Sequence, residues 1–450
     1  MSRVTVLFAL FFFTAGARAL PAQQTSIVFN GVTVVPMDRD EVLPNQTVVI
    51  ENGRIAYVGA PRSSPAGATT IDARGKFLMP GLAEFHAHVP SGNQAMHAHR
   101  ALTLYVLAGV TTARGMLGAP MHLALRDSIR AGQLLGPRLL TSGPSFNNNS
   151  VSSPAVAVAM VTDQKNAGYD LLKIHPGVPR SAFDSLAATA NRLRIPFAGH
   201  VPLEVGLDVA LTSKYSTIDH LDGLIEAMYN GAAPLTPQLN GFFGLGIVRQ
   251  LEQSRFQSII DRVKVSGVAM VPTEILLDNY ANDLTGEQLT SRAEFRYWVP
   301  QQVAAWKAQK DNILAQLPVP KEQRQEFLAL RRRFIKALHD AGVLFLLGSD
   351  APQLWNVPGF SAHRELGALV AAGLTPFQAL RTGTVNVARF LGEENRAGVV
   401  RSGARADLIL LDANPLQDVS NTLRIHGVVV NGRWIGPEER QRMLLALEER

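Results

Sequence analysis

The chain has 450 residues, of which 46% are hydrophobic, and it contains no cysteine, so the composition excludes a disordered chain and a disulfide framework. The formal charge is +6, but the basic residues are scattered and no nucleic-acid-binding motif accompanies them, so we expect no nucleic-acid partner.

The chain begins with a short apolar segment. Arg3 precedes the apolar run 4–15, and small residues at 16–22 suit cleavage by a signal peptidase. The alternative is a membrane anchor, but a spanning helix needs roughly 20 apolar residues and no later segment supplies them. We therefore expect residues 1–22 to be a cleaved signal peptide, a secreted or periplasmic location, and no integral membrane segment in the mature chain.

Both ends of the mature chain have the pattern of short β-strands. Four segments are apolar or alternating: 26–35, 47–58, 406–411 and 427–434. The pairs Asn52-Gly53 and Asn431-Gly432 predict tight hairpin turns. We expect residues 23–79 and 395–436 to join in one small β-sandwich, with 437–450 as a helical tail.

Between these ends, short apolar segments alternate with helix-like stretches. Eight segments are strand candidates: 82–89, 110–116, 137–143, 170–175, 196–201, 217–222, 268–275 and 343–350. Eight strands in β/α alternation predict an α/β fold, a closed (β/α)8 TIM barrel over residues 80–394.

Two segments interrupt the alternation. Residues 231–246 are rich in Gly, Pro, Asn and Phe, and 276–340 form a long insertion with helical character. Segments that follow barrel strands shape the substrate pocket or a lid, so we expect both at the catalytic rim. The alternative is an oligomer contact, and assembly into a homo-oligomer is left open.

Histidines stand at the predicted strand ends. His86 and His88 are two apart on a strand, so both side chains point to the same face. His97 and His99 have the same spacing in a predicted helix, where such residues do not share a face, and we assign them to the surface.

Three further polar residues end predicted strands. His200 ends the fifth strand, His220 the sixth and Asp350 the eighth, where a core would require apolar side chains. A single histidine of this kind is as well explained by a structural hydrogen bond, but five donors at one rim indicate a metal site.

Lys173 ends the fourth strand, where an ammonium group would repel cations. It is either a simple cationic lysine or, after reaction with carbon dioxide, a carbamate that bridges two metal ions roughly 3.5 to 4 Å apart.

The ordered set His86-Ala87-His88, Lys173, His200, His220 and Asp350 resembles the dinuclear amidohydrolase superfamily. Residues 78–82, 108–112 and 403–408 resemble it as well. The resemblance implies that His86, His88 and Asp350 hold one metal ion, that His200 and His220 hold a second, and that carboxylated Lys173 bridges them. It also implies zinc, although nitrogen and oxygen donors suit other divalent ions.

By this resemblance the chain hydrolyses an amide by attack of a metal-bridging hydroxide, with Asp350 as general acid and base. The framing sequences resemble the imidazolonepropionase-like and prolidase-like branch, which suggests a small-molecule substrate, a dipeptide or an N-acyl amino acid with a free carboxylate. The residues after Lys173 depart from the Gly-rich stretch of prolidase-like enzymes, so substrate contacts cannot be transferred.

Three residues are candidates for substrate contact, each with a plain alternative. His175 could contact the substrate or be solvated, and Tyr229 could stabilise an oxyanion or pack. Arg114 could anchor a substrate carboxylate or a structural acid.

Two rival functions stay open. One is a mononuclear deaminase or cyclic amidase, against which Lys173 argues. The other is an exported metal-binding or solute-binding protein without turnover.

Overall fold

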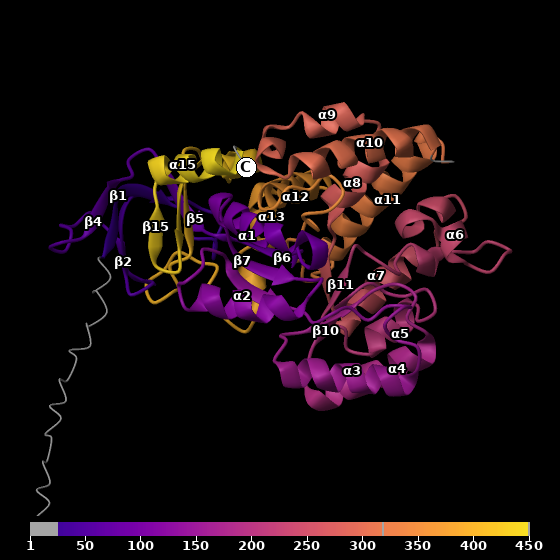
Figure 1. Ribbon diagram of the computed structural model, residues 1–450. Coiled ribbons are helices and arrows are strands. Elements are labelled where there is room, and N and C mark those ends of the chain that lie inside the picture. Colours follow the sequence, from indigo (N-terminus) through magenta and orange to yellow (C-terminus); the bar gives the residue numbers. More distant parts are fainter. Residues whose placement is uncertain (1–25, 317–318, 449–450) are drawn as a thin grey trace, which may run out of the picture.

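A computed structural model describes residues 26–316 and 319–448 (Figure 1). The expected signal peptide, 1–22, lies outside the described residues. Among the described residues, no helix is both long and apolar enough to cross a membrane.

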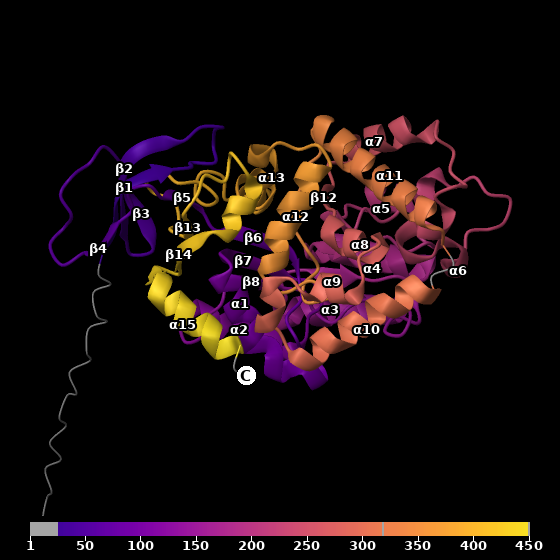
Figure 2. The same ribbon diagram turned by 90° about the horizontal axis from the view of Figure 1, so that it is seen from above.

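Both ends of the chain contribute to one eight-stranded sheet at one end of the molecule (Figures 1 and 2). Its main order is β15-β14-β13-β5-β1-β2-β3, with β4 paired to β1. The two ends of the chain meet where β5 and β13 pair antiparallel, with Phe77 opposite Leu411. The strands are β1 Ile27–Val34, β2 Leu43–Glu51, β3 Arg54–Gly59, β4 Thr69–Asp72, β5 Phe77–Pro80, β13 Leu408–Leu411, β14 Ile425–Val430 and β15 Arg433–Ile435.

The sheet folds over an apolar cluster of its own. The amide of Ile55 in β3 donates to Ala404 O at 2.9 Å, so the edge strand returns to the segment that precedes β13. Phe29, Val48 and Leu410 lie in the enclosed cluster. Tight turns join β2 to β3 and β14 to β15 at the two Asn-Gly pairs, where both residues of each pair have positive φ. The folded sheet is the β unit predicted from both ends of the sequence.

Seven barrel strands form two parallel arcs. The first arc has the order β6-β7-β8 and the second β9-β10-β11-β12. The strands are β6 Leu82–Ala87, β7 Val110–Gly115, β8 Arg138–Thr141, β9 Leu172–Ile174, β10 Phe197–Gly199, β11 Thr217–Asp219 and β12 Ala269–Val271.

The eighth segment, 343–350, completes the ring without being a regular strand. Leu346 N donates to Met270 O of β12 at 2.9 Å, and Leu347 O accepts from Phe85 N of β6 at 2.7 Å. A parallel bridge between Ser142 and Leu171 joins the two arcs on the other side. The expected TIM barrel is confirmed, with single bridges in place of continuous ladders at its junctions.

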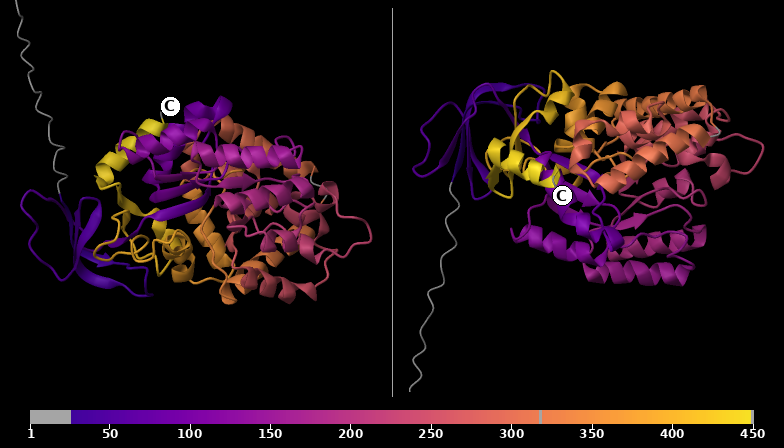
Figure 3. Two further views of the ribbon diagram at one scale, coloured as in Figure 1. Left: turned by 90° about the horizontal axis from the view of Figure 1, so that it is seen from below. Right: turned by 45° about the horizontal axis from the view of Figure 1, so that its top comes forward.

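Helices surround these strands, as the two further views in Figure 3 show. Those that follow the barrel segments, with the tail helix, are α1 Ala98–Leu107, α2 Pro120–Arg130, α3 Pro154–Ala167, α4 Arg180–Leu193, α5 Leu207–Thr212, α7 Arg255–Ser266, α12 Phe360–Ala371, α13 Pro376–Thr382, α14 Val385–Phe390 and α15 Pro437–Glu448. Helix α12 turns its buried residues, among them Ala362, Leu366 and Leu369, into the main core.

The first predicted insertion holds only short helical segments, and the second is largely helical over its described residues. The first contains α6 Pro237–Asn240 and the 3-10 segment η3 Phe242–Ile247, preceded by η2 Glu226–Met228. The second contains α8 Glu274–Ala281, α9 Gly286–Thr290, η4 Ala293–Tyr297, α10 Pro300–Gln316 and α11 Lys321–Asp340. Shorter 3-10 segments are η1 Gly92–His97 and η5 Val419–Leu423.

Candidate metal centre

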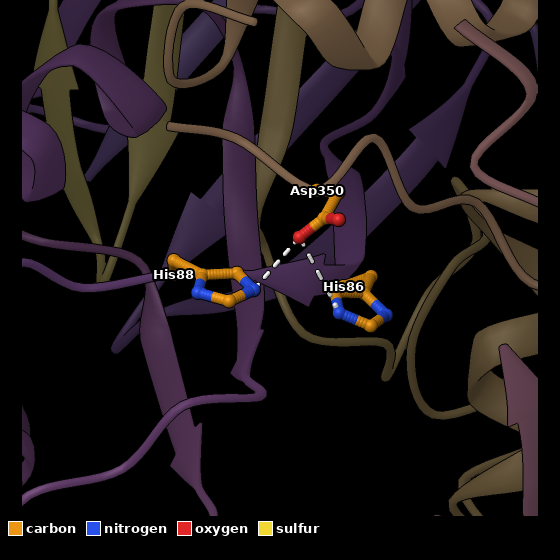
Figure 4. A group of neighbouring side chains, drawn as sticks. All are labelled: His86, His88 and Asp350. Carbon is orange, nitrogen blue, oxygen red and sulfur yellow. Dashed lines mark ion pairs between the residues drawn. The ribbon is translucent and has the colours of Figure 1, made fainter. Parts of the chain in front are cut away.

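His86, His88 and Asp350 converge at the end of β6. The Oδ1 atom of Asp350 lies 2.7 Å from Nε2 of His88 and 3.5 Å from Nε2 of His86 (Figure 4). One donor atom from each residue lies within 4.8 Å of the others, and all three residues are buried. Two imidazoles and a carboxylate at this spacing can hold a divalent transition-metal ion.

Close packing positions this group. Gly348 lies two residues before Asp350, and a Cβ atom there would approach His86 N to 2.8 Å. Glu84, buried in β6, accepts from Ser349 N at 2.6 Å and from Ser349 Oγ at 2.8 Å. Glu84 therefore ties the eighth segment to the strand that carries the two histidines.

A buried acid lies beside His86. Oδ2 of Asp219 lies 2.8 Å from Nδ1 of His86, although off the ideal hydrogen-bond direction. Arg114 faces the same carboxylate at 3.4 Å and donates to Phe85 O at 2.7 Å. Arg114 is 2% exposed and does not line the cavity described below, so it anchors a structural acid and is not placed to bind substrate.

Hydrogen bonds at Nδ1 orient His200 and His220. Nδ1 of His200 lies 2.7 Å from Oδ2 of Asp222, and Nδ1 of His220 lies 2.8 Å from Oγ1 of Thr273. The ring of His220 lies 4.4 Å from that of His200 and 4.5 Å from that of His86, measured between centroids. With each Nδ1 engaged, Nε2 is left as the donor that a metal would take.

The Nε2 atom of His220 is buried and has no hydrogen-bond partner among the described residues. A buried polar atom without a partner costs about 1 to 3 kcal/mol, so it calls for a ligand. Burial also lowers the pKa of His86, His200 and His220 well below the usual value, which keeps these imidazoles neutral and their lone pairs available.

Lys173 lies fully buried among these donors, with Nζ 3.3 Å from Nε2 of His86. Burial lowers the pKa of its amine to about 8. Gly199, on the neighbouring strand, makes room for the side chain, because a Cβ atom there would lie 2.9 Å from Cδ of Lys173. The lysine side chain is therefore held at the centre of the site, not at its surface.

The backbone at the site is strained. His220 has φ 63° and Asp350 φ 65°, a region that non-glycine residues rarely adopt. Arg331 of α11 holds the first of these turns: its guanidinium donates to His220 O at 2.9 Å and pairs with Glu274 at 2.8 Å. An arginine of the second insertion thus holds the backbone of a candidate metal ligand in place.

Sequence reasoning missed five residues that support the donors: Glu84, Asp219, Asp222, Thr273 and Arg331. Three of these are acids within two positions of a candidate ligand in the sequence. This closeness in sequence could have indicated that they support the ligands. Thr273 and Arg331 lie far from His220 in the sequence, so only the folded chain brings them together.

A cavity of about 570 Å³ opens above the candidate metal centre. Five of the six predicted ligands line it, and the sixth, His220, lies next to the ring of His200. His175 lines it as well and stacks on His200 at 5.0 Å, as a substrate contact would require. Both insertions reach its wall, through Phe242 and Leu276 among others.

Three other residues lie away from this cavity. Tyr229, for which an oxyanion contact and a packing role were both open, donates its hydroxyl to Ala233 O at 2.8 Å and does not line the cavity. His97 is half-buried, His99 is exposed, and neither lines the cavity.

Comparison with known proteins matches residues 77–435 to the amidohydrolase family. The imidazolonepropionase of Kosmotoga olearia is 22% identical over 407 residues, 89% of this chain and 93% of that protein. Two solved structures share the fold. A bottromycin amidohydrolase has a TM-score of 0.70 and 24% identity, covering 94% of this chain and 90% of its own. A putative prolidase from Bifidobacterium longum has a TM-score of 0.68 and 24% identity, covering 95% and 100%.

Proposed function

This chain belongs to the amidohydrolase family and is a hydrolase of carbon–nitrogen bonds. From that premise we propose that it cleaves an amide with the help of two divalent metal ions. The proposed substrate is a small molecule, a dipeptide or an N-acyl amino acid, encountered outside the cytoplasm. The observation that carries the proposal is the unpartnered Nε2 of His220 beside the neutral imidazoles of His86 and His200.

The candidate metal ligands divide into two groups, one for each proposed ion, and Lys173 is shared by both groups. His86, His88 and Asp350 would hold one ion, and His200 and His220 the other. Lys173 stands between the groups and would bridge both ions as a carbamate. Nitrogen and oxygen donors suit zinc.

Bound divalent ions would supply an activated water and polarise the substrate carbonyl. Asp350 would take the proton of that water and return it to the departing amine. Its contacts with His86, His88 and Gln353 all use Oδ1, so we assign the proton transfer to Oδ2. His175 is neutral because burial lowers its pKa, and from the cavity wall it would contact the substrate without adding charge.

Metal analysis of purified protein tests the proposal. We expect about two equivalents of divalent metal per chain, and hydrolysis of members of a dipeptide and N-acyl amino acid panel. One equivalent at saturating metal would overturn the dinuclear centre, and a metal-loaded protein inactive on every amide in the panel would overturn the proposed substrate class.

A mononuclear cyclic amidase is the second candidate, favoured by the similarity to an imidazolonepropionase. It predicts one metal ion and opening of a cyclic amide in preference to a linear one. The buried lysine beside His86 favours the dinuclear alternative.

A further inference from the structure

The wall of the cavity offers acceptors but almost no cations. Among the described lining residues, Lys173 is the one lysine or arginine, and it lies within the candidate metal centre. Besides Asp350 of the candidate metal centre, three acids line the same cavity: Glu204, Asp222 and Glu226. Asp222 is engaged by His200 at 2.7 Å. A substrate carboxylate would thus find no free basic side chain on the described wall.

Glu226 and Asn240 form an acidic corner. Oε2 of Glu226 accepts from Gly223 N at 3.0 Å, and Oε1 accepts from Asn240 Nδ2 at 2.9 Å. Both groups that donate hydrogen bonds to this carboxylate are therefore neutral. Asn240 is 8% exposed, and its Oδ1 has no hydrogen-bond partner among the described residues. Burial raises the pKa of Glu226 to about 6, which leaves it ionised at neutral pH.

An aromatic wall joins this corner to the metal centre. The ring of Phe243 lies 5.1 Å from that of His220 and 5.9 Å from that of His200. The next residue, Gly244, packs against the corner, since a Cβ atom there would lie 3.6 Å from Oε1 of Glu226. Phe243 and Glu226 both line the cavity, so a ligand with an apolar stem could contact the ring and the carboxylate together.

A partly buried carboxylate without a cationic partner is costly, and ammonium or guanidinium groups make the strongest hydrogen bonds to it. Resting on the proposed amide hydrolysis, we propose that Glu226 and Asn240 form a cation subsite, which selects substrates carrying an ammonium or guanidinium group on an apolar stem. Within the proposed substrate class this favours dipeptides with a basic residue over acids such as N-acyl glutamate.

A pair of nearly isosteric probes tests the subsite without turnover. Calorimetry on the metal-loaded protein would compare 3-phenylpropylguanidine, which is cationic, with 3-phenylpropylurea, which is neutral. We expect the guanidine to bind about tenfold tighter or better, the effect of a charge-assisted contact. Glu226→Gln should remove this preference while the affinity for the urea stays within about twofold.

Glu204→Gln is the matched control, because Glu204 is an exposed acid on the same cavity. It should change guanidine affinity by less than about threefold, as exposed charges contribute little. Equal losses of guanidine affinity in Glu226→Gln and Glu204→Gln would overturn the subsite. Equal affinity of the wild type for the guanidine and the urea would overturn it as well. If Glu226→Gln also lowers the affinity for the urea, the Glu226→Asp variant is measured, because it keeps the negative charge. Loss of the preference for the guanidine in Glu226→Asp would overturn the proposal.

Turnover separates the two proposals. We expect Lys-containing dipeptides to have a higher kcat/KM than the norleucine equivalents, and Glu226→Gln to equalise them through KM. Hydrolysis without that preference would overturn the subsite and leave amide hydrolysis standing. A preference in binding without hydrolysis of any amide would overturn the proposed function and leave the subsite standing.

Discussion

Two buried lysines of this chain have contrasting surroundings. Lys310 donates to three backbone carbonyls, those of Asn279, Tyr280 and Asn282, at 2.7 to 3.0 Å. Lys173 instead has an imidazole nitrogen 3.3 Å away and lies between candidate metal ligands. The first environment stabilises an ammonium group, whereas the second fits an anionic carbamate between cations.

Lys173→Ala should lose at least one equivalent of metal and nearly all activity, because the bridging ligand is gone. Added bicarbonate or a small carboxylate should restore part of both, since it can occupy the vacated position. Metal content and rates with and without the additive measure this. Lys310→Ala is the control, expected to lose stability without rescue. Full activity in Lys173→Ala would contradict the carbamate.

The convergence of the candidate donors could be predicted from the sequence because each stands at or near a strand end, where β/α alternation brings side chains to one rim. Their supports could not. Thr273 reaches His220 across 53 positions, and Tyr229, only nine residues after His220, turns away. Strand periodicity predicts which rim a residue occupies, but the path of a loop depends on contacts distant in sequence.

His363 gives a pH dependence that is independent of the candidate metal site. It is buried in α12, with Nε2 2.7 Å from Ala108 O and Nδ1 2.8 Å from Thr422 Oγ1. Burial lowers its pKa from 6.5 to about 4. Below pH 6.5 the unfolded chain takes up a proton that the folded chain refuses, so stability falls as the pH drops from 6.5 towards 4.

His363→Gln should therefore lose part of this dependence. The melting temperature of the wild type should decrease more than that of the variant between pH 7 and pH 4.5, because glutamine does not titrate. The shift corresponds to a few kcal/mol at most, about 1.4 kcal/mol for each pKa unit. Parallel pH profiles of the two proteins would rule out the assignment.

At the scale of elements, α11 is part of the barrel structure and not a detachable lid. Arg331 is 1% exposed and joins α11 to Glu274, Pro272 O and His220 O. The sequence predicts a helical insertion at this place from composition. It does not predict that an arginine 111 positions after His220 holds the carbonyl of that histidine.

Arg331→Met should destabilise the protein by about 3 to 5 kcal/mol, because it leaves Glu274 as an uncompensated buried charge. The double variant with Glu274→Gln should recover part of the loss. Thermal and urea melts of both proteins measure the coupling. The exposed pair of Arg249 and Glu326 is the control, whose removal should cost less than about 1 kcal/mol. Additive effects at the buried pair would contradict the argument.

At the scale of the whole molecule, the barrel consists of two arcs joined through isolated bridges, and the candidate ligands come from both arcs. His86 and His88 belong to the β6 side, Lys173, His200 and His220 to the second arc, and Asp350 to the irregular eighth segment. Metal ions at this site would therefore add a link between the two arcs and the eighth segment beyond the backbone hydrogen bonds at the junctions. The folded sheet has its own apolar cluster and no share in the site.

Removal of metal should consequently lower the melting temperature by several degrees, since an ion present at 100 times its Kd adds about 2.7 kcal/mol. Calorimetry with and without a chelator measures this, and Lys173→Ala should show a smaller difference. Hydrogen exchange should increase at the junctions, around 142–146 and 344–347, and stay unchanged in β1 and β2, which serve as the internal reference. Uniform exchange over barrel and sheet would contradict a metal centre that joins the two arcs.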